Sequence, residues 1–452
     1  MFTKDKAFYK SFIHLALALM LEQAVVLSVN LADNLMLGTY SEAALSGVAA
    51  VNQIQFVYQQ LVYAIGNALV VLGSQYWGQR RTGEIRSIAA VAIRLEILLA
   101  LGLFILVSIF PGGAVRIFTE QELFVQEGVK YLNIMRFSYV FFALTAVLLS
   151  SMRVVETVKI ALRVSIVSLV INISINYLLI AGNLGAPELG AEGAAIGTLT
   201  ARIVEFIIVG CFVLRDKKLG LRLRHLLPMN RTLARDYMRV AVVMLFTSLC
   251  WGLFTALQTV ILGHMNDSAI AAQSISNTVY LLLKVAAVGA GSAAAVIIGK
   301  TVGAGDMDRL KCYSRTLQLL FVGIGASMAL LMFLIRLPLL RIYSARITPE
   351  TYGMANTYML IQSATLLFMS YELPVNTGII RGGGDPRFVM IMDMCSLFIF
   401  IPVAYVCAFV LELPAVFVII SMNIDQMLKC FPAFFYSNSY RWVHRLTRAQ
   451  TE

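Results

Sequence analysis

Asp33 has the clearest chemical potential in this sequence, because it is an acid inside an apolar stretch, with Asn30 and Asn34 beside it. Shielding from water favours the neutral form of a carboxyl group, so such a group can alternate between protonated and ionised forms near neutral pH. The same oxygens could ligate sodium. The alternative is a carboxylate that touches water at a helix end. Asp33 is therefore our first candidate for binding H⁺ or Na⁺.

Asn172 and Asn176 form a second candidate group. They are four residues apart and would share one face of a helix. Amide side chains can hydrogen-bond or coordinate a cation, but they cannot carry a proton. Thr198 is a further candidate for the same cluster. The alternative for the asparagines is hydrogen bonding between helices, which needs no bound ion or substrate.

The second half of the chain carries three charged residues in apolar stretches, namely Lys284, Glu372 and Asp393. We expect Lys284 to be neutral or paired, with Glu372 or Asp393 as its partner. This group could contact a substrate or a bound cation. The alternative is a structural ion pair. Asp425 and Lys429 are four residues apart and should form a local pair.

Glu22 lies eleven residues before Asp33, which corresponds to about 16 Å along a helix. It could act as a relay or contact a substrate, or it could form a polar contact between helices. Two further pairs, Arg94 with Glu96 and Arg202 with Glu205, are expected near helix ends without a functional role.

The stretch after residue 48 is unusually polar, with Asn52, Gln53, Gln55, Gln59 and Gln60. A solvated lining explains this composition best, and a contact between two halves of the molecule is the alternative. Tyr58 and Met36 could supply adaptable apolar and cation–π contacts to organic cations, although most such residues only pack. Met135, Trp251 and Met369 are similar candidates.

The composition indicates the elements that must hold these residues. Hydrophobic residues make up 59% of the 452 residues and charged residues 13%, whereas a soluble domain has roughly 45–50% and about 25%. This excludes a soluble enzyme, a disordered scaffold and a nucleic-acid-binding protein. The cysteines and histidines show no metal-binding spacing, and no nucleotide-binding fingerprint is present, so we expect neither a cofactor nor an enzyme.

Apolar runs long enough to span a membrane recur along the chain. We predict an all-α polytopic protein with twelve spans, the first of which is a retained helix and not a signal peptide. The spans are about 12–37, 48–73, 88–110, 131–151, 160–181, 191–214, 238–262, 273–299, 316–337, 355–380, 388–411 and 413–436.

The distribution of Lys and Arg predicts the orientation. With the N-terminus inside, 26 of the 36 basic residues fall in cytoplasmic segments and 6 on the opposite side. Because cytoplasmic loops carry the excess of basic residues, both termini are expected in the cytoplasm. The basic surplus is thus topological and indicates no nucleic-acid partner.

The two halves of the chain repeat one another. Residues 33–54 align with 258–279 at an offset of 225, and near the fourth and tenth spans the offset becomes 228, pairing Arg153 with Arg381. We therefore predict an N-terminal lobe at 1–214, a cytoplasmic linker at 215–237 and a C-terminal lobe at 238–452. Duplicated halves with a site between them are typical of secondary transporters.

Several motifs, in order, resemble those of the multidrug and toxic compound extrusion (MATE) family. They are DNLMLG at 33–38 with EAAL at 42–45, GSQYWG at 73–78, LGAEGAAIGT at 189–198, GKTVGAGD at 299–306 and RGGGDPR at 381–387. The resemblance covers essentially the whole chain.

The resemblance implies two six-helix lobes around a central cleft and export of amphipathic, often cationic, compounds against H⁺ or Na⁺. It matches the family's coupling acid to Asp33. The chain looks closer to the DinF-like than to the NorM-like branch, but Asn176 replaces the aspartate of the former. The NorM-like branch has an acid in its seventh helix, and this chain has none in the matching region. The acid of that branch's tenth helix aligns near Ser370 of this chain. A monomer in the cytoplasmic membrane of a bacterium, in contact with lipids, is the expectation.

Two rival functions remain at this point. The first is a flippase for lipid-linked precursors, disfavoured because Arg94 and Arg202 are the only basic residues of the first half that we assign to a span and to neither side of the membrane. The second is a sensor, which should carry a soluble domain, or a channel, which would need no ion gradient.

Overall fold

The structure is a computed structural model that describes residues 3–226, 228, 230–263, 267–343 and 347–448. Every regular element within these ranges is helical. Helices suit an apolar chain because a helix satisfies its own backbone hydrogen bonds without water. Residues 264–266, which belong to the second copy of the repeat, and Arg346, one of the basic residues predicted outside, fall in the gaps of this description.

The first half of the chain forms helices of very different lengths. They are α1 (Lys6–Tyr40), α2 (Glu42–Gly78), α3 (Thr82–Ile109), α4 (Pro111–Arg116), α5 (Glu122–Met135), α6 (Ser138–Val154), α7 (Lys159–Leu179) and α8 (Ala191–Arg215). Two short 3₁₀ turns follow α7 and α8, at η1 (Asn183–Gly185) and η2 (Leu223–Leu226).

The second half contains longer helices. They are α9 (Arg231–Gly263), α10 (Asp267–Ala304), α11 (Met307–Tyr343), α12 (Pro349–Pro374), α13 (Pro386–Tyr405) and α14 (Ala415–Ser439). Helices α12 and α13 each continue into a π-helical turn, η3 (Val375–Ile380) and η4 (Val406–Val410). Pro374 directly precedes the first of these turns, as expected where a proline removes a helical hydrogen bond.

Each of the twelve predicted spans coincides with a helix or a bent pair of helices in the structure. Ten of the described helices are long and apolar enough to cross a membrane, and α5 with α6, which are bent by 53° at their junction, would be an eleventh. The remaining predicted span is α12 with η3. This span buries a series of polar side chains, among them Gln362, Ser363, Thr365, Ser370 and Glu372, so it is less apolar than the others.

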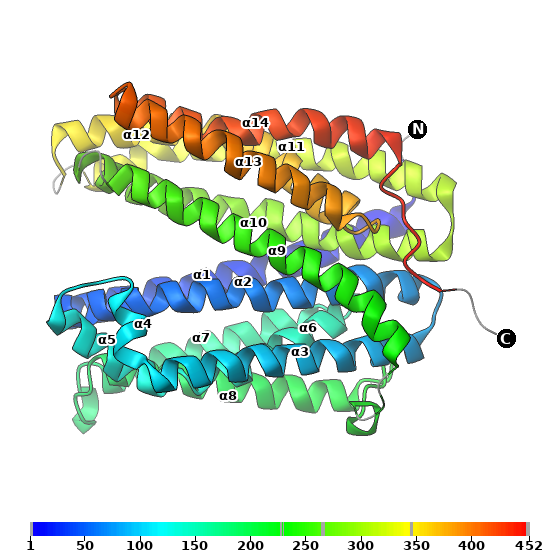
Figure 1. Ribbon diagram of the computed structural model, residues 1–452, viewed down its shortest axis with the longest axis horizontal. Coiled ribbons are helices and arrows are strands. Elements are labelled where there is room, and N and C mark those ends of the chain that lie inside the picture. Colours follow the sequence, from blue (N-terminus) through cyan, green and yellow to red (C-terminus); the bar gives the residue numbers. More distant parts are fainter. Residues whose placement is uncertain (1–2, 227, 229, 264–266, 344–346, 449–452) are drawn as a thin grey trace. The chain divides into compact units, whose positions relative to one another are not determined.

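The chain divides into two compact units, which we call the N-terminal unit (Leu21–Leu245) and the C-terminal unit (Met1–Met20 with Phe246–Glu452). They differ from the predicted lobes because the start of α1 belongs to the C-terminal unit and the start of α9 to the N-terminal unit. The two junctions, Met20–Leu21 and Leu245–Phe246, are 225 residues apart, which equals the offset of the repeat. The long helices within each unit run roughly parallel (Figure 1).

The first residues of the chain are fixed to α11 inside the C-terminal unit. The Thr3 amide donates to Thr316 Oγ1 at 3.0 Å, and the Tyr313 hydroxyl donates to Asp5 Oδ2 at 2.9 Å. The rings of Phe8 and Tyr313 stack with their centroids 4.3 Å apart. These contacts explain why the beginning of α1 groups with helices that come much later in the sequence.

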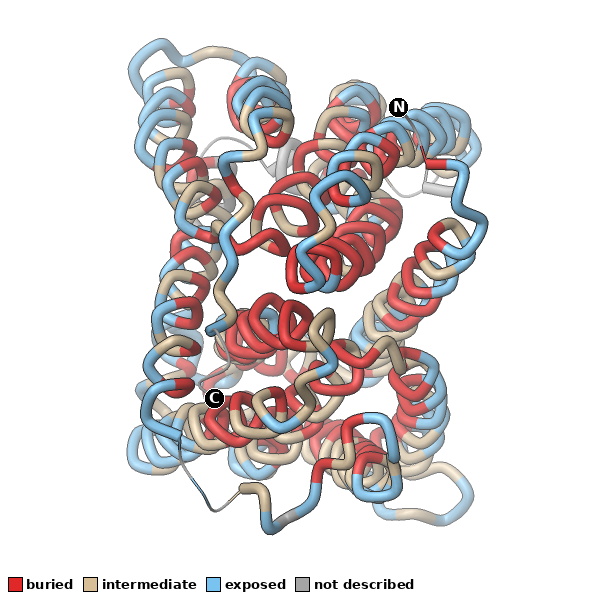
Figure 2. The backbone as a smooth tube through the Cα atoms, turned by 90° about the vertical axis from the view of Figure 1, so that its right-hand side faces the viewer, coloured by how far each residue is buried: buried red, intermediate tan, exposed pale blue. Residues whose placement is uncertain are grey.

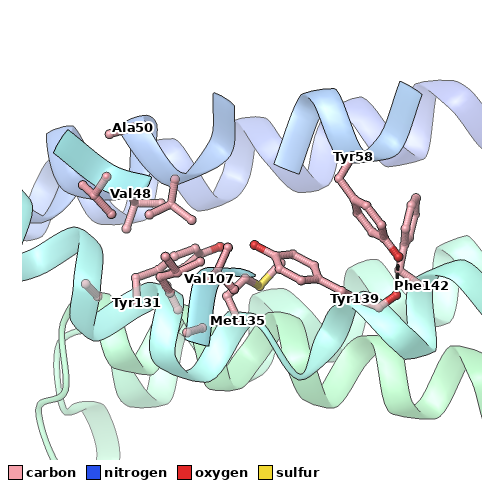
Figure 3. Close-up of a cluster of buried hydrophobic side chains, with 14 of the residues drawn as sticks. Val48, Ala50, Tyr58, Val107, Tyr131, Met135, Tyr139 and Phe142 are labelled. Carbon is pink, nitrogen blue, oxygen red and sulfur yellow. Dashed lines mark hydrogen bonds between the residues drawn. The ribbon is translucent and has the colours of Figure 1, made fainter. Parts of the chain in front are cut away.

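Each unit has its own apolar core, and buried residues follow the inner sides of the helices (Figure 2). In the N-terminal unit, Tyr58 packs on Tyr139 and Phe142 with ring centroids 5.1 and 6.1 Å apart, and its hydroxyl donates to the Tyr139 carbonyl at 2.8 Å (Figure 3). In the C-terminal unit, Tyr358 and Leu366 of α12 belong to the corresponding core.

The glycine-rich segment before α13 forms a tight turn. Asp385 caps α13 by accepting from the Phe388 amide at 3.2 Å, and it also accepts from the Tyr436 hydroxyl. Gly383 lies directly against the ring of Trp442, where a Cβ would overlap the ring atoms. The turn therefore requires a residue without a side chain at that position.

Candidate functional site

The structure brings Asp33, Asn172, Asn176 and Thr198 together inside the N-terminal unit. Asn176 Nδ2 donates to Asp33 Oδ1 at 2.5 Å and lies 3.3 Å from Asn172 Oδ1. Asn172 Nδ2 lies 3.3 Å from Thr198 Oγ1. A continuous chain of hydrogen bonds thus joins α1, α7 and α8, and we call these four residues the Asp33 cluster.

Small residues at the contact between α7 and α8 hold the Asp33 cluster in place. A Cβ on Gly197 would overlap Asn176 Oδ1, and a Cβ on Gly193 would lie 2.6 Å from the Leu179 carbonyl oxygen. Close helix approach at small residues is the common packing mode of membrane helices. The glycines of α8 therefore allow the α7 asparagines to reach both neighbouring helices.

The four residues of the cluster differ in their exposure. Asn172 and Asn176 are fully buried and Thr198 is nearly so, whereas Asp33 is half-buried. Asn176 Oδ1 has no hydrogen-bond donor among the described residues. A carboxylate, two amide groups and a hydroxyl thus lie along one hydrogen-bond chain, and such a set could bind a proton on Asp33 or a small monovalent cation.

Two residues next to the Asp33 cluster, Tyr131 and Arg202, interact electrostatically with Asp33. Tyr131 of α5 is buried and interacts electrostatically with Thr198 and Asp33. Arg202, one turn beyond Thr198 on α8, also interacts with Asp33. Sequence analysis did not identify Tyr131, because a tyrosine in an apolar run carries no signal that separates it from core aromatics.

Arg202 forms a buried ion pair that the sequence predicted. Its Nη1 lies 2.7 Å from Glu205 Oε2, and the guanidinium stacks over Phe142 with Cζ 4.9 Å from the ring centroid. Arg202 and Glu205 line a small crevice together with Ser165 and Ser168 of α7 and three valines of α1, Val25, Val26 and Val29.

Glu22 lies in the N-terminal unit and not with the charged residues of the second half. It is 7% exposed, and no described residue hydrogen-bonds its Oε2. Its electrostatic neighbours are Arg153 of α6, Glu205 of α8 and Tyr63 of α2.

The remaining candidates of the first half occupy different environments. Tyr58 is 2% exposed and belongs to the core, which favours its interpretation as a packing residue. Met36 packs at the edge of the same core. Gln59 is half-buried on α2.

The charged residues of the C-terminal unit form a network in which Asp393 is central. Asp393 Oδ2 lies 3.4 Å from Arg381 Nη2, and Asp393 Oδ1 lies 3.3 Å from Lys429 Nζ. Lys429 also pairs with Asp425 at 3.4 Å, which confirms the predicted local pair. Two cations and two carboxylates therefore compensate one another.

Lys284 makes a different contact from the one predicted. Its Nζ lies 5.3 Å from the ring centroid of Trp251 in a cation–π arrangement, and it interacts with Glu372 and Asp425 only at longer range. Asp393 is already engaged by Arg381 and Lys429. Glu372 accepts a hydrogen bond from Asn376, one turn further on.

The predicted pair of Arg94 with Glu96 is wrong. Arg94 Nη2 donates to the Leu226 carbonyl at 2.5 Å, so the guanidinium reaches the loop after α8. Glu96 is fully buried, and neither of its oxygens has a hydrogen-bond partner in the part of the chain that the structure describes. A two-residue spacing puts the side chains on different faces of a helix, which explains the failure.

Sequence comparison gives consistent relatives over the full length. The chain is 25% identical over 449 residues to "Probable multidrug resistance protein NorM" of Thermotoga maritima, covering 98% of this chain and 95% of that protein. It is 22% identical over 446 residues to "Uncharacterized transporter YisQ" of Bacillus subtilis, covering 98% and 96%.

Structural comparison agrees on the fold. The chain superposes on a crystal structure described as MATE in complex with MaL6, with a TM-score of 0.86 and 16% identity, over 95% of each chain. A sequence model of the MatE family matches residues 18–178 and 243–406, which is well over half of the chain. Both repeats are included in this match, and the chain therefore belongs to the MatE family.

Proposed function

We propose that this chain is a secondary active multidrug exporter, which exchanges amphipathic or cationic organic compounds for H⁺ or Na⁺ by alternating access. Coupling takes place at the Asp33 cluster. The observation that supports this assignment is the hydrogen-bond chain from Asp33 through Asn176 and Asn172 to Thr198. It offers the carboxyl group a fixed neutral partner, so Asp33 can gain or lose a cation without rearrangement of a salt bridge.

The choice of substrate class rests on the relatives. Several curated relatives with 80–98% of this chain aligned are named as probable multidrug resistance proteins. Acidic groups such as Asp33 would attract a cationic compound, and competition between that compound and the coupling ion would make the coupling reciprocal. The branch within the family stays a prediction.

The coupling ion is limited by the ligands of the cluster. Asp33 is the only carboxylate among its four residues, and no group of three or more His, Cys, Asp or Glu side chains is arranged for a metal among the described residues. One negative charge suits a single proton or a single sodium ion. Divalent cations usually take more carboxylate ligands.

The location of the protein is part of the proposal. The helices that could cross a membrane support a polytopic protein, and the relatives named above are bacterial. The excess of basic residues in alternate loops supports cytoplasmic termini. We therefore expect the cytoplasmic membrane of a bacterium.

The test is ethidium efflux from proteoliposomes under an imposed proton gradient or an imposed sodium gradient. The variants are Asp33→Asn and, as a matched control, Asp308→Asn, which makes the same chemical change at an exposed residue of α11. Efflux driven by one of the gradients should be lost in Asp33→Asn and retained in Asp308→Asn.

Other outcomes would change the conclusion. Gradient-driven efflux that survives in Asp33→Asn would keep the exporter and move coupling to the network of Lys284, Glu372 and Asp393. The absence of efflux under both gradients would contradict multidrug export and favour a flippase for lipid-linked precursors.

A further inference from the structure

Glu22 is a buried acid that the proposed coupling site does not use. It lies on the same helix as Asp33, two residues after the point where α1 leaves the C-terminal unit. It is 7% exposed, and its Oε2 has no hydrogen-bond partner within the described ranges. An ionised carboxylate in this position would lack the hydrogen bonds that normally offset the loss of water.

The charges around Glu22 do not neutralise it. Arg202 is already paired with Glu205 at 2.7 Å, and Glu205 itself repels a negative charge on Glu22. Arg153 of α6 and Tyr63 of α2 are the other ionisable groups that face Glu22 in the described part of the N-terminal unit, and neither forms an ion pair or a hydrogen bond with it. Ser165 and Ser168 of α7 carry no charge.

The repeat offers an internal comparison. At the offset of 228, Arg153 corresponds to Arg381, and Ser165 corresponds to Asp393. In the C-terminal unit, Arg381 and Asp393 form a direct ion pair at 3.4 Å. The N-terminal unit has Ser165 at this position of α7, and its acid, Glu22, lies on α1 without an ion pair to Arg153 among the described residues. The two halves thus differ: one holds a direct ion pair, and the other holds an acid without a fixed partner.

A small crevice beside Arg202 and Glu205 lies about one turn further along α1 than Glu22. It is lined by Val25, Val26 and Val29, the residues that follow Glu22 by one to two turns on α1, and by Ser165 and Ser168. A water molecule in this polar crevice could take up the proton that Glu22 releases.

We propose that Glu22 is a second proton-binding group of the transporter, which is neutral in the described conformation and releases its proton when substrate binds. This inference rests on the proposed function, because it adds a second ionic event to the cycle of an exporter whose first event takes place at Asp33. Arg153 would stabilise the ionised form after release. The exchange involves only a proton moving between Glu22 and water.

The test measures the dissociation constant of ethidium as a function of pH with purified protein. Each proton released on binding makes the affinity rise about tenfold per pH unit, over the range in which the group is protonated in the free protein. If both groups release protons, the ethidium affinity of the wild type should rise about a hundredfold per pH unit. The affinity of Glu22→Gln and of Asp33→Asn should each rise about tenfold per pH unit, and that of the double variant should not change with pH.

Two further variants separate titration from packing. Glu96→Gln makes the same substitution at another buried acid of the N-terminal unit without partners, and it should retain the wild-type pH dependence. Glu22→Asp keeps an ionisable group and should also retain it. If Glu22→Asp and Glu96→Gln lose the same pH dependence as Glu22→Gln, the loss reflects packing, and this result overturns the proposal.

The outcomes for the two sites are distinct. Wild-type pH dependence in Glu22→Gln overturns the proposal for Glu22 and leaves Asp33 untouched. If Asp33→Asn keeps the ion dependence of the wild type while Glu22→Gln loses pH dependence, only the coupling role of Asp33 is contradicted. If Asp33 binds sodium, the ethidium affinity of the wild type should rise only about tenfold per pH unit, and that of Glu22→Gln should not change with pH.

A second measurement needs no substrate. The infrared difference spectrum between low and high pH should contain a protonated carboxyl band that is absent in Glu22→Gln and present in Glu96→Gln. If Glu22→Gln removes no titrating band, the proposal is overturned even when ethidium does not bind.

Discussion

The contact of α8 with α7 at Gly197 predicts a variant that disturbs the Asp33 cluster without removing any polar group. In Gly197→Ala the new methyl group would overlap Asn176 Oδ1 and lie 3.5 Å from the Asn172 carbonyl oxygen. Either Asn176 changes its rotamer or α8 moves away from α7. Both responses weaken the 2.5 Å hydrogen bond from Asn176 to Asp33.

Gly210→Ala in the same helix is the matched control. A Cβ at Gly210 meets no atom within 4 Å, so this variant gains only the better helix propensity of alanine, about 1 kcal/mol. Gly197→Ala gains the same amount and loses about 1–3 kcal/mol through overpacking. The difference in unfolding free energy between the two variants therefore isolates the packing cost and should be about 1–3 kcal/mol, with Gly197→Ala the less stable.

The functional effect follows from the displaced hydrogen bond. A hydrogen bond to a charged group contributes about 1.5–3 kcal/mol, and 1.4 kcal/mol corresponds to tenfold in affinity. The apparent affinity for the coupling ion should therefore change by about tenfold or more in Gly197→Ala and stay unchanged in Gly210→Ala.

The assays are thermal unfolding in detergent and gradient-driven ethidium efflux at varied ion concentration. Equal unfolding temperatures and equal ion dependence of the two variants would refute the reasoning. Such a result would mean that the close approach of α7 and α8 does not determine the position of Asn176.

Three further predictions concern other parts of the molecule. Tyr58→Phe removes a buried hydrogen bond and should cost about 0.5–1.5 kcal/mol of unfolding free energy while efflux persists; selective loss of efflux for some substrates would instead assign Tyr58 to substrate binding. Asp393→Asn leaves Arg381 and Lys429 without their shared carboxylate and should cost about 3–5 kcal/mol, seen as a low yield of folded protein; a normal yield and unfolding temperature would contradict a structural role for the network. Hydrogen bonds from Tyr313 and the Ala7 amide lower the pKa of Asp5. The ionised Asp5 therefore stabilises the folded protein above the ordinary pKa of an aspartate, about 4, and this stabilisation is lost as the pH falls below that value. Tyr313→Phe should reduce the loss of thermal stability between about pH 6 and 3, and an unchanged loss would contradict this.

Much of the fold was predictable because hydropathy and the repeat act over long stretches of sequence. All twelve predicted spans correspond to helices. The division of α1 and α9 between the two units was not predictable, because it depends on contacts such as that of Phe8 with Tyr313, which leave no pattern in the local sequence.

The candidate site was predictable where spacing places side chains on one face. Asn172 and Asn176 are four residues apart and do share a hydrogen bond, and the same spacing gave the pair of Asp425 with Lys429. Partners across helices were harder to predict. The partner of Lys284 is an aromatic ring, Glu96 has no partner, and Tyr131 was not distinguished from core residues, since each outcome depends on helix packing.

The attachment of the N-terminal segment to α11 has a consequence for biosynthesis. Thr3 hydrogen-bonds a residue 313 positions later, which at 5–20 residues per second emerges from the ribosome roughly 15–60 s afterwards. During this interval the first turns of α1 lack their final neighbours, although the rest of the helix can already pack. Membrane insertion must therefore hold this segment in a provisional environment until α11 has been inserted. Slowed translation within the second half should lengthen the period in which the N-terminus is open to proteases.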